Sequence, residues 1–200
     1  MSTVITLNNI GYEINQSEAL RYMGAQKPNN ALTNLLNEAI KKVRSLCSPA
    51  GCYIKLPISI NSNSIDFGFT EVKSSDLAKN LKGCNEVYIF AATLGTKLDL
   101  EINRALLTSP ALAVALDAVG SAAIEGVANS INNQLKLDDK NLKPRFSPGY
   151  GDLDLSFQKQ VVSVLDTHRK IGLSLTDGLM LTPTKSITAI IGIPNQESGL

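Results

Sequence analysis

The stretch Glu86-Val87-Tyr88-Ile89-Phe90-Ala91-Ala92 decides the fold class of this chain. It is a short and continuous apolar run, which is typical of a strand that is buried in a core. The residues that follow, Thr93-Leu94-Gly95-Thr96, end this strand and begin a helix that continues to about residue 107. The centre of the chain is therefore predicted to be a buried strand followed by a helix.

Helix and strand patterns lie irregularly on both sides of this strand. Toward the N-terminus, the spacing of apolar residues predicts helices at 17–24, capped by Ser17, and from Asn30 to a break at 48–51. Strands are predicted at 53–60 and 65–69, and a short helix near 75–81. Toward the C-terminus, Ser109-Pro110 favours the start of a long helix through residue 135. A charged linker at 136–143, a helix from 157 to Gly172, and strands at 178–181 and 186–193 complete the prediction.

This order of elements predicts a single α+β domain over residues 1–200, because its strands are clustered and do not alternate regularly with helices. With 200 residues, 44% of them hydrophobic and 18% charged, the chain can bury a sizeable core. The net charge of +1 argues against a nucleic-acid surface. We find no apolar run of about 18 residues and no signal-peptide pattern, so we expect a cytoplasmic protein without a membrane span.

Cysteine and histidine usage limits the chemistry. The chain has 3 cysteines and 1 histidine, His168. An odd and low cysteine count argues against a disulfide framework, and Cys47 and Cys52 do not have a zinc-site spacing. A hydrolytic triad has no support in the spacing of residues, so we nominate no catalytic residue and no metal ligand.

The loop Arg145-Phe146-Ser147-Pro148-Gly149-Tyr150-Gly151 carries the strongest indication of binding. A guanidinium offers a planar fork of donors that fits a carboxylate. Pro148 stiffens the turn, the two glycines permit close approach of a ligand, and Tyr150 adds a flat apolar face with a polar tip. The pattern fits a small molecule with a carboxylate and a ring. The alternative is a surface turn with a solvated arginine.

Three further patterns have both a functional and a structural interpretation. Asp117, Ser121 and Glu125 share one side of the long helix, where they could receive an ammonium or hydroxyl group, or face solvent or another helix. The segment Thr93-Leu94-Gly95-Thr96 could present free amides at a helix start, or be a tight turn. Lys185, between the two C-terminal strands, could face a phosphate or an acidic partner, with an exposed lysine as the default expectation.

Several of these stretches, taken together and in order, resemble the activation domain of cobalamin-dependent methionine synthase. The resemblance is carried by Ala92-Thr93-Leu94-Gly95, by the helix segment from Asp117 to Glu125, by the Arg-x-x-x-Gly-Tyr motif from Arg145 to Tyr150, and by Pro183-Thr184-Lys185-Ser186. A weaker match is Leu20-Arg21-Tyr22-Met23-Gly24. The resemblance implies a bent antiparallel sheet flanked by helices, with S-adenosylmethionine held in a shallow groove.

The resemblance also implies the site and the reaction. Arg145 would contact the ligand, Ser147, Gly149 and Tyr150 would shape its pocket, and Glu125 would be an acidic neighbour. The implied role is reactivation of a methionine synthase or related corrinoid protein, in which cob(II)alamin on that partner is methylated from S-adenosylmethionine with one electron from a flavodoxin-like donor. The protein itself would place the methyl group, since the cofactors carry the difficult chemistry.

Two departures from the family pattern leave an alternative open. Gly151-Asp152-Leu153-Asp154-Leu155 stands where long family members have a Pro-Ala-Cys-Pro-x-His run, and the chain lacks the Asp-Trp-Thr-Pro segment. The alternative is a non-catalytic docking module for a corrinoid methyltransferase that has lost S-adenosylmethionine binding. A third hypothesis is an unrelated small-molecule enzyme on an α+β fold.

Overall fold

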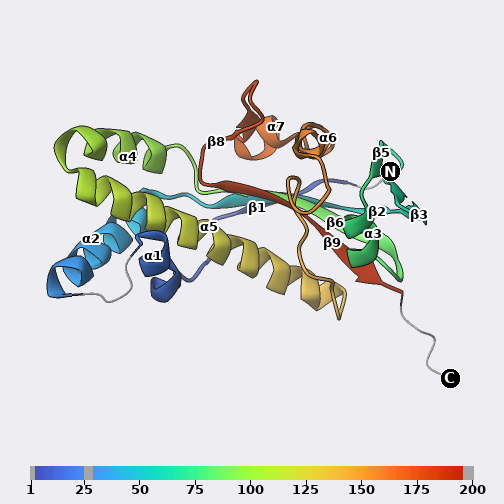
Figure 1. Cartoon of the computed structure of the whole chain (residues 1–200), viewed down its shortest axis with the longest axis horizontal. Helices are drawn as coiled ribbons and strands as arrows, with labels where there is room; N and C mark the ends of the chain where they lie inside the picture. Colours follow the sequence, from blue (N-terminus) through green and yellow to red (C-terminus); the bar gives the residue numbers. More distant parts are fainter. Residues whose placement is uncertain (1–2, 25–28, 196–200) are drawn as a thin grey trace.

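The centre of the molecule is a four-stranded antiparallel sheet (Figure 1). The computed structural model describes residues 3–24 and 29–195. The strand order is β1-β2-β6-β9, with β1 at Ile5–Asn8, β2 at Ala50–Pro57, β6 at Cys84–Thr93 and β9 at Ser186–Pro194. The predicted buried strand is confirmed as β6, which pairs with β2 on one side and with β9 on the other.

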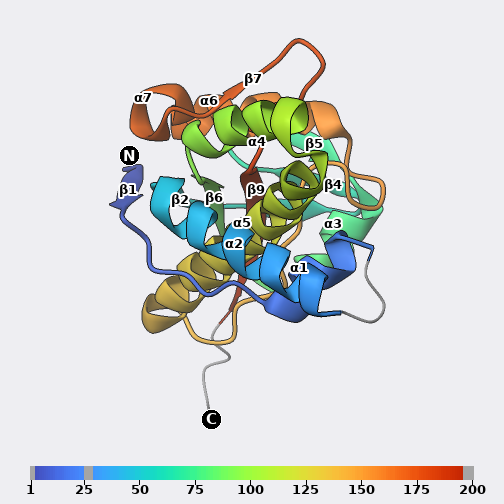
Figure 2. The same ribbon diagram turned by 90° about the vertical axis from the view of Figure 1, so that its left-hand side faces the viewer.

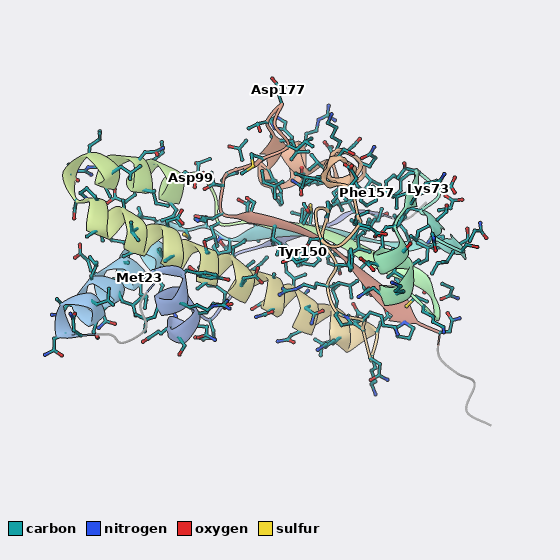
Figure 3. The ribbon with its side chains drawn as sticks, viewed as in Figure 1. Met23, Lys73, Asp99, Tyr150, Phe157 and Asp177 are labelled. Carbon is teal, nitrogen blue, oxygen red and sulfur yellow. The ribbon has the colours of Figure 1, made fainter. Side chains whose placement is uncertain are left out.

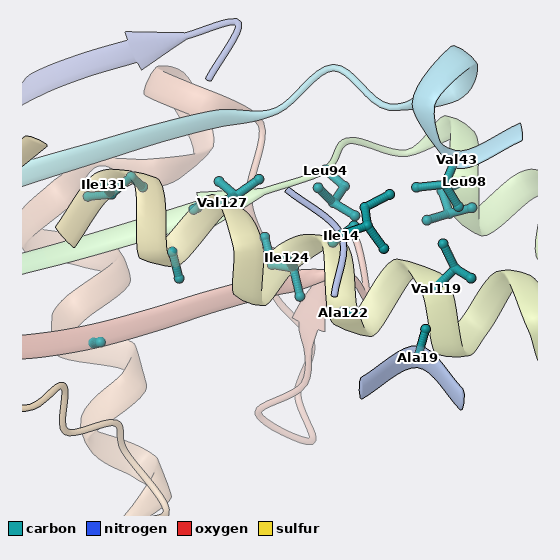
Figure 4. Packing of buried hydrophobic residues seen from close by; sticks show 14 of the residues in the cluster. Ile14, Ala19, Val43, Leu94, Leu98, Val119, Ala122, Ile124, Val127 and Ile131 are labelled. Carbon is teal, nitrogen blue, oxygen red and sulfur yellow. The ribbon is translucent and has the colours of Figure 1, made fainter. Parts of the chain in front are cut away.

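Alternate side chains of β6 enter two different cores, as the pleat of a strand requires. Tyr88 and Phe90 pack into one core, and Val87 and Ile89 pack into the other. The first core is covered by four helices, which are α1 (Gln16–Tyr22), α2 (Asn30–Leu46), α4 (Lys97–Thr108) and α5 (Pro110–Asp138). In Figure 4, Val127 and Ile131 point from α5 toward the sheet, and Val119 points toward Leu98.

The opposite face of the sheet is covered by shorter elements (Figure 2). The helical ones are α3 (Ser75–Asn80), the 3-10 turn η1 (Leu155–Phe157), α6 (Gln158–Leu165) and α7 (Thr167–Ile171). Two small antiparallel sheets join them, one with β3 (Ser59–Asn61), β4 (Ser64–Asp66) and β5 (Glu71–Lys73), the other with β7 (Ser174–Leu175) and β8 (Leu181–Thr182). The α+β prediction, with an antiparallel sheet between helices, is confirmed.

Helix α5 is the longest element and positions the site described below. Pro110 occupies its first turn as predicted, but the Ser109 side chain makes no capping bond in the described structure. By length and composition alone this helix could cross a membrane, yet 61% of its most apolar window is buried inside the protein. Such burial is typical of the central helix of a core.

The structure corrects several predicted element bounds. Strand β1 was missed, and the expected strand at 53–60 divides at Pro57, since a proline cannot donate to the sheet ladder. The first helix is capped by Asn15 and not by Ser17. The helix expected from 157 to 172 breaks at Asp166, whose φ is 48°. Residues 178–180 belong to the turn between β7 and β8, and the expected charged linker begins as the last turn of α5.

Candidate functional site around Arg145 and Glu125

Residues 143–146 lie along the outer edge of β9 and place Arg145 beside the sheet. Phe146 and Ile190 exchange both backbone hydrogen bonds, at 2.9 and 2.8 Å. The Lys143 amide donates to the Gly192 carbonyl at 2.9 Å. The loop after α5 therefore runs back along the sheet and continues the ladder past β9, which fixes its backbone.

Arg145 and Glu125 meet across the space between this edge segment and α5. Nη2 of Arg145 donates to Oε2 of Glu125 at 3.0 Å, with the two side chains 24% and 35% exposed. Nη1 of Arg145 is buried and has no hydrogen-bond partner among the residues that the structure describes. One interpretation of the sequence was a surface turn with a solvated arginine, but this arginine is not freely solvated. Its guanidinium also retains N–H donors that are not used within the described residues.

The turn after Arg145 orients Ser147 inward and Tyr150 outward. Ser147 Oγ donates to the Thr188 carbonyl on β9 at 2.7 Å. Gly149 has a φ of 89°, a conformation that favours glycine, and its amide donates to the Leu153 carbonyl at 2.9 Å. The Tyr150 ring is 66% exposed, in the loop between α5 and α6 (Figure 3).

Asp152, which follows this turn, attaches it to the start of α3. The Asp152 carboxylate accepts hydrogen bonds from the Ser75 and Asp76 amides at 2.8 and 3.1 Å, and from the Ser74 hydroxyl. The bond from Ser74, followed by those from the two amides, lowers the pKa of Asp152 below its usual value. Asp152 therefore anchors the turn by accepting hydrogen bonds at the start of α3.

The same face of α5 holds a second cation of this chain. Lys185 Nζ lies 2.7 Å from Asp117 Oδ1 and 3.0 Å from Ser121 Oγ. Its side chain is only 10% exposed, so the expectation of an exposed lysine is wrong. The acidic partner is Asp117, and the polar face of Asp117, Ser121 and Glu125 receives an ammonium and a guanidinium from the sheet edge.

The segment at 93–96 forms a tight turn whose amides are mostly used within the fold. The Leu94 amide donates to the Lys185 carbonyl at 2.9 Å, and the Gly95 amide donates to Thr93 Oγ1 at 3.1 Å. Gly95 has a φ of 85°. The tight-turn interpretation fits this geometry better than an open binding site at the start of α4.

A cavity of about 420 Å³ lies on the neighbouring face of α5. Its lining is partly polar, and Glu13 and Asn15 from the segment before α1 face Gly126 and Asn129 of α5 across it. Arg145 and Tyr150 are not among its lining residues. Sequence reasoning missed this cavity. Its one signal was Gly126 in α5, which permits close approach of another backbone.

The residues at 3–24 and 29–195 contain no group of three or more His, Cys, Asp or Glu side chains placed to hold a metal ion. Cys47, Cys52 and Cys84 are free thiols.

The architecture is that of an α+β domain with a charged pair between its longest helix and the edge of its main sheet. Among solved structures, this chain is similar to the crystal structure of the MetH reactivation domain bound to AdoHcy, with a TM-score of 0.73 and 12% sequence identity. The match covers 99% of this chain and 80% of that chain. At this identity the likeness shows a shared fold.

Two comparisons of sequence gave no match. No model of a known protein family matches the chain. No curated protein matches it either.

Proposed function

We propose that this protein binds S-adenosylmethionine and supports reductive methylation of cob(II)alamin on a methionine synthase or related corrinoid protein. Two findings support the proposal. The chain shares its fold with a reactivation domain that was crystallised with AdoHcy. The pair of Arg145 and Glu125 provides opposite charges side by side at a partly buried position.

The Arg145–Glu125 pair is the observation that carries the proposal. The amino-acid end of S-adenosylmethionine has a carboxylate and an ammonium group on one carbon. A guanidinium fits the carboxylate, and a carboxylate fits the ammonium. The unpartnered Nη1 of Arg145 supports this fit, because a buried donor without a partner costs free energy that a ligand oxygen would recover.

The turn from Ser147 to Tyr150 would form the second wall of the site. Ser147 is held to β9 through its hydroxyl, which fixes the backbone of the turn. Gly149 leaves the backbone uncovered, and Tyr150 offers an exposed ring against which a base can stack. The cavity beside Gly126, on the neighbouring face of α5, would give the rest of the ligand space.

In the proposed role the chain binds and orients its ligand. S-adenosylmethionine supplies the methyl group when bound, and the cobalamin belongs to the partner protein. Arg145 and Glu125 would fix one end of the ligand, so that the methyl group is held toward the partner. A flavodoxin-like protein is the proposed electron donor, and the cytoplasm is the proposed location.

Calorimetric titration with S-adenosylmethionine tests the proposal. We expect binding by the wild type, and a loss of about 1.5–3 kcal/mol in Arg145→Ala, as for a hydrogen-bonded charged group. Arg169→Ala is the matched control, since Arg169 is 83% exposed on α7 and contacts Asp166 at 3.9 Å. The proposal is contradicted if the folded wild type gives no heat of binding, or if both variants lose the same amount of binding free energy.

The alternative function is a docking module without ligand binding. The observation that favours it is that Glu125 already neutralises Arg145 within the chain. This alternative expects association with a corrinoid methyltransferase in a pull-down, unchanged by Arg145→Ala, together with no heat on titration with S-adenosylmethionine. Loss of association in that variant would count against it.

A further inference from the structure

We propose that the protein has a second site, which binds a small anion carrying two or more phosphate charges. The site is a cleft of about 750 Å³ at the far end of the sheet from Lys185. We call it the basic cleft, and define it by Lys82, Lys140 and Lys143 together with Gly83 and Asn195. It is separate from the Arg145 turn, and it does not depend on S-adenosylmethionine binding.

Three segments that are distant in the sequence build the basic cleft. Lys82 and Gly83 lie between α3 and β6, Lys140 and Lys143 follow α5, and Asn195 follows β9. The Asn195 amide donates to the Gly83 carbonyl at 2.9 Å, which joins two of these segments. The segment that holds Lys140 and Lys143 is joined to β9 by the hydrogen bond from the Lys143 amide to the Gly192 carbonyl, also at 2.9 Å. The walls are therefore held by backbone bonds.

Among the described residues, the lining of the basic cleft carries positive charge and no acidic side chain. Its three lysines form no ion pair with any residue at 3–24 or 29–195. The whole chain has a net charge of only +1, so three cations around one concave surface are a local concentration. Such a cleft focuses the electric field and attracts anions, and lysine is a common phosphate ligand.

A second hollow favours a ligand larger than inorganic phosphate. It has a volume of about 480 Å³ and shares Lys82 and Gly83 with the basic cleft. Its lining includes Ser62, Asn63 and Ser75, which offer neutral hydrogen-bonding groups. Phosphate groups would lie in the basic cleft and a neutral polar part in this hollow. A concave pair of hollows fits a small molecule better than the flat surface of an acidic protein.

Calorimetric titration with pyrophosphate at low ionic strength tests the site. The test variant is Lys82→Gln/Lys140→Gln/Lys143→Gln. Glutamine is chosen because it keeps much of the aliphatic stem of Lys143, whose Cγ packs near Gly192. The matched control is Lys97→Gln/Lys159→Gln/Lys170→Gln, which removes the same charge from exposed positions elsewhere. We expect binding by the wild type and by the control, and a loss of about tenfold or more in the test variant.

Three outcomes would overturn the proposal. No heat with the wild type excludes a pyrophosphate site, and an equal loss in both triple variants means general attraction by net charge. Tighter binding of polyglutamate than of pyrophosphate, lost in the same test variant, would make the cleft a surface for an acidic protein. If the test variant fails to fold by circular dichroism, the single variants Lys82→Gln and Lys140→Gln replace it, and each must weaken binding.

Discussion

Lys185 Nζ lies 2.7 Å from Asp117 Oδ1, although the lysine side chain is 10% exposed and the aspartate side chain 60% exposed. The pair joins the residue just before β9 to the N-terminal third of α5. Gly120 makes this possible, because a Cβ there would lie 3.2 Å from Lys185 Cγ. The buried cation depends on a carboxylate that water can reach from its other side.

This asymmetry predicts unequal effects of the two charge deletions. Asp117→Ala leaves a buried ammonium without its counter-charge and should lower the free energy of unfolding by about 2–3 kcal/mol. Lys185→Met removes the charge and keeps the packed stem, so it should cost about 1 kcal/mol or less. Urea denaturation of both variants at pH 7 measures the difference.

The double variant Asp117→Ala/Lys185→Met is the control for this interpretation. It should be more stable than Asp117→Ala alone, because it no longer contains an uncompensated buried charge. If the double variant is the least stable of the three, the cost in Asp117→Ala does not come from the charge on Lys185.

The elements that could be predicted from the sequence have strong local signals. The apolar run of β6 and the apolar stripe of α5 each specify burial without reference to the rest of the chain. Strand β1 was missed because it has only four residues, Ile5–Asn8, which is too short for a pattern of alternation to stand out. Its place in the sheet comes from pairing with β2, which is a contact distant in the sequence.

The candidate site was predictable only in part. The four-residue spacing of Asp117, Ser121 and Glu125 indicated a polar face on an apolar helix, but not which cations it receives. Lys185 and Arg145 reach that face because β9 and the segment beside it lie along α5, which is a tertiary arrangement. The capping role of Asp152 likewise depends on α3, about 77 residues earlier in the chain.

Asp139, just after α5, gives the fold a dependence on pH. Its Oδ2 accepts hydrogen bonds from the Tyr88 hydroxyl at 2.6 Å and from Lys55 Nζ at 2.9 Å. Burial alone would raise the pKa of Asp139, but these two bonds outweigh it and hold the pKa below the ordinary value of 3.8. A carboxyl group with a lowered pKa in the folded state stabilises that state only when it is ionised.

We therefore predict that the free energy of unfolding falls less between neutral and acid pH in Asp139→Asn than in the wild type. At pH 7 the variant should be less stable than the wild type by about 1–3 kcal/mol. This difference should persist above the unfolded-state pKa and vanish as the pH falls through 3.8 and then through the lower folded-state pKa. Urea denaturation across this range measures it. The neighbouring Asp138→Asn, at an exposed residue, is the control, and a constant difference at all pH values would contradict the prediction.

The two glycines of α5 allow a comparison of backbone and side-chain crowding. A Cβ at Gly126 would lie 2.0 Å from the Glu13 carbonyl oxygen, whereas at Gly120 the nearest atom is Leu98 Cδ2 at 2.8 Å. Alanine is otherwise favoured over glycine within a helix by about 1 kcal/mol. We expect Gly126→Ala to destabilise the protein by about 1–3 kcal/mol, because the backbone before α1 must move away from α5.

Gly120→Ala should lower the free energy of unfolding by less than Gly126→Ala does, since the end of a leucine side chain moves more easily than a backbone carbonyl. Thermal and urea denaturation of both variants measure this difference. A Gly126→Ala protein as stable as the wild type would mean that the segment at Glu13 does not pack on α5 as described. The cavity between that segment and Asn129 would then have no fixed wall, because the same close approach forms it.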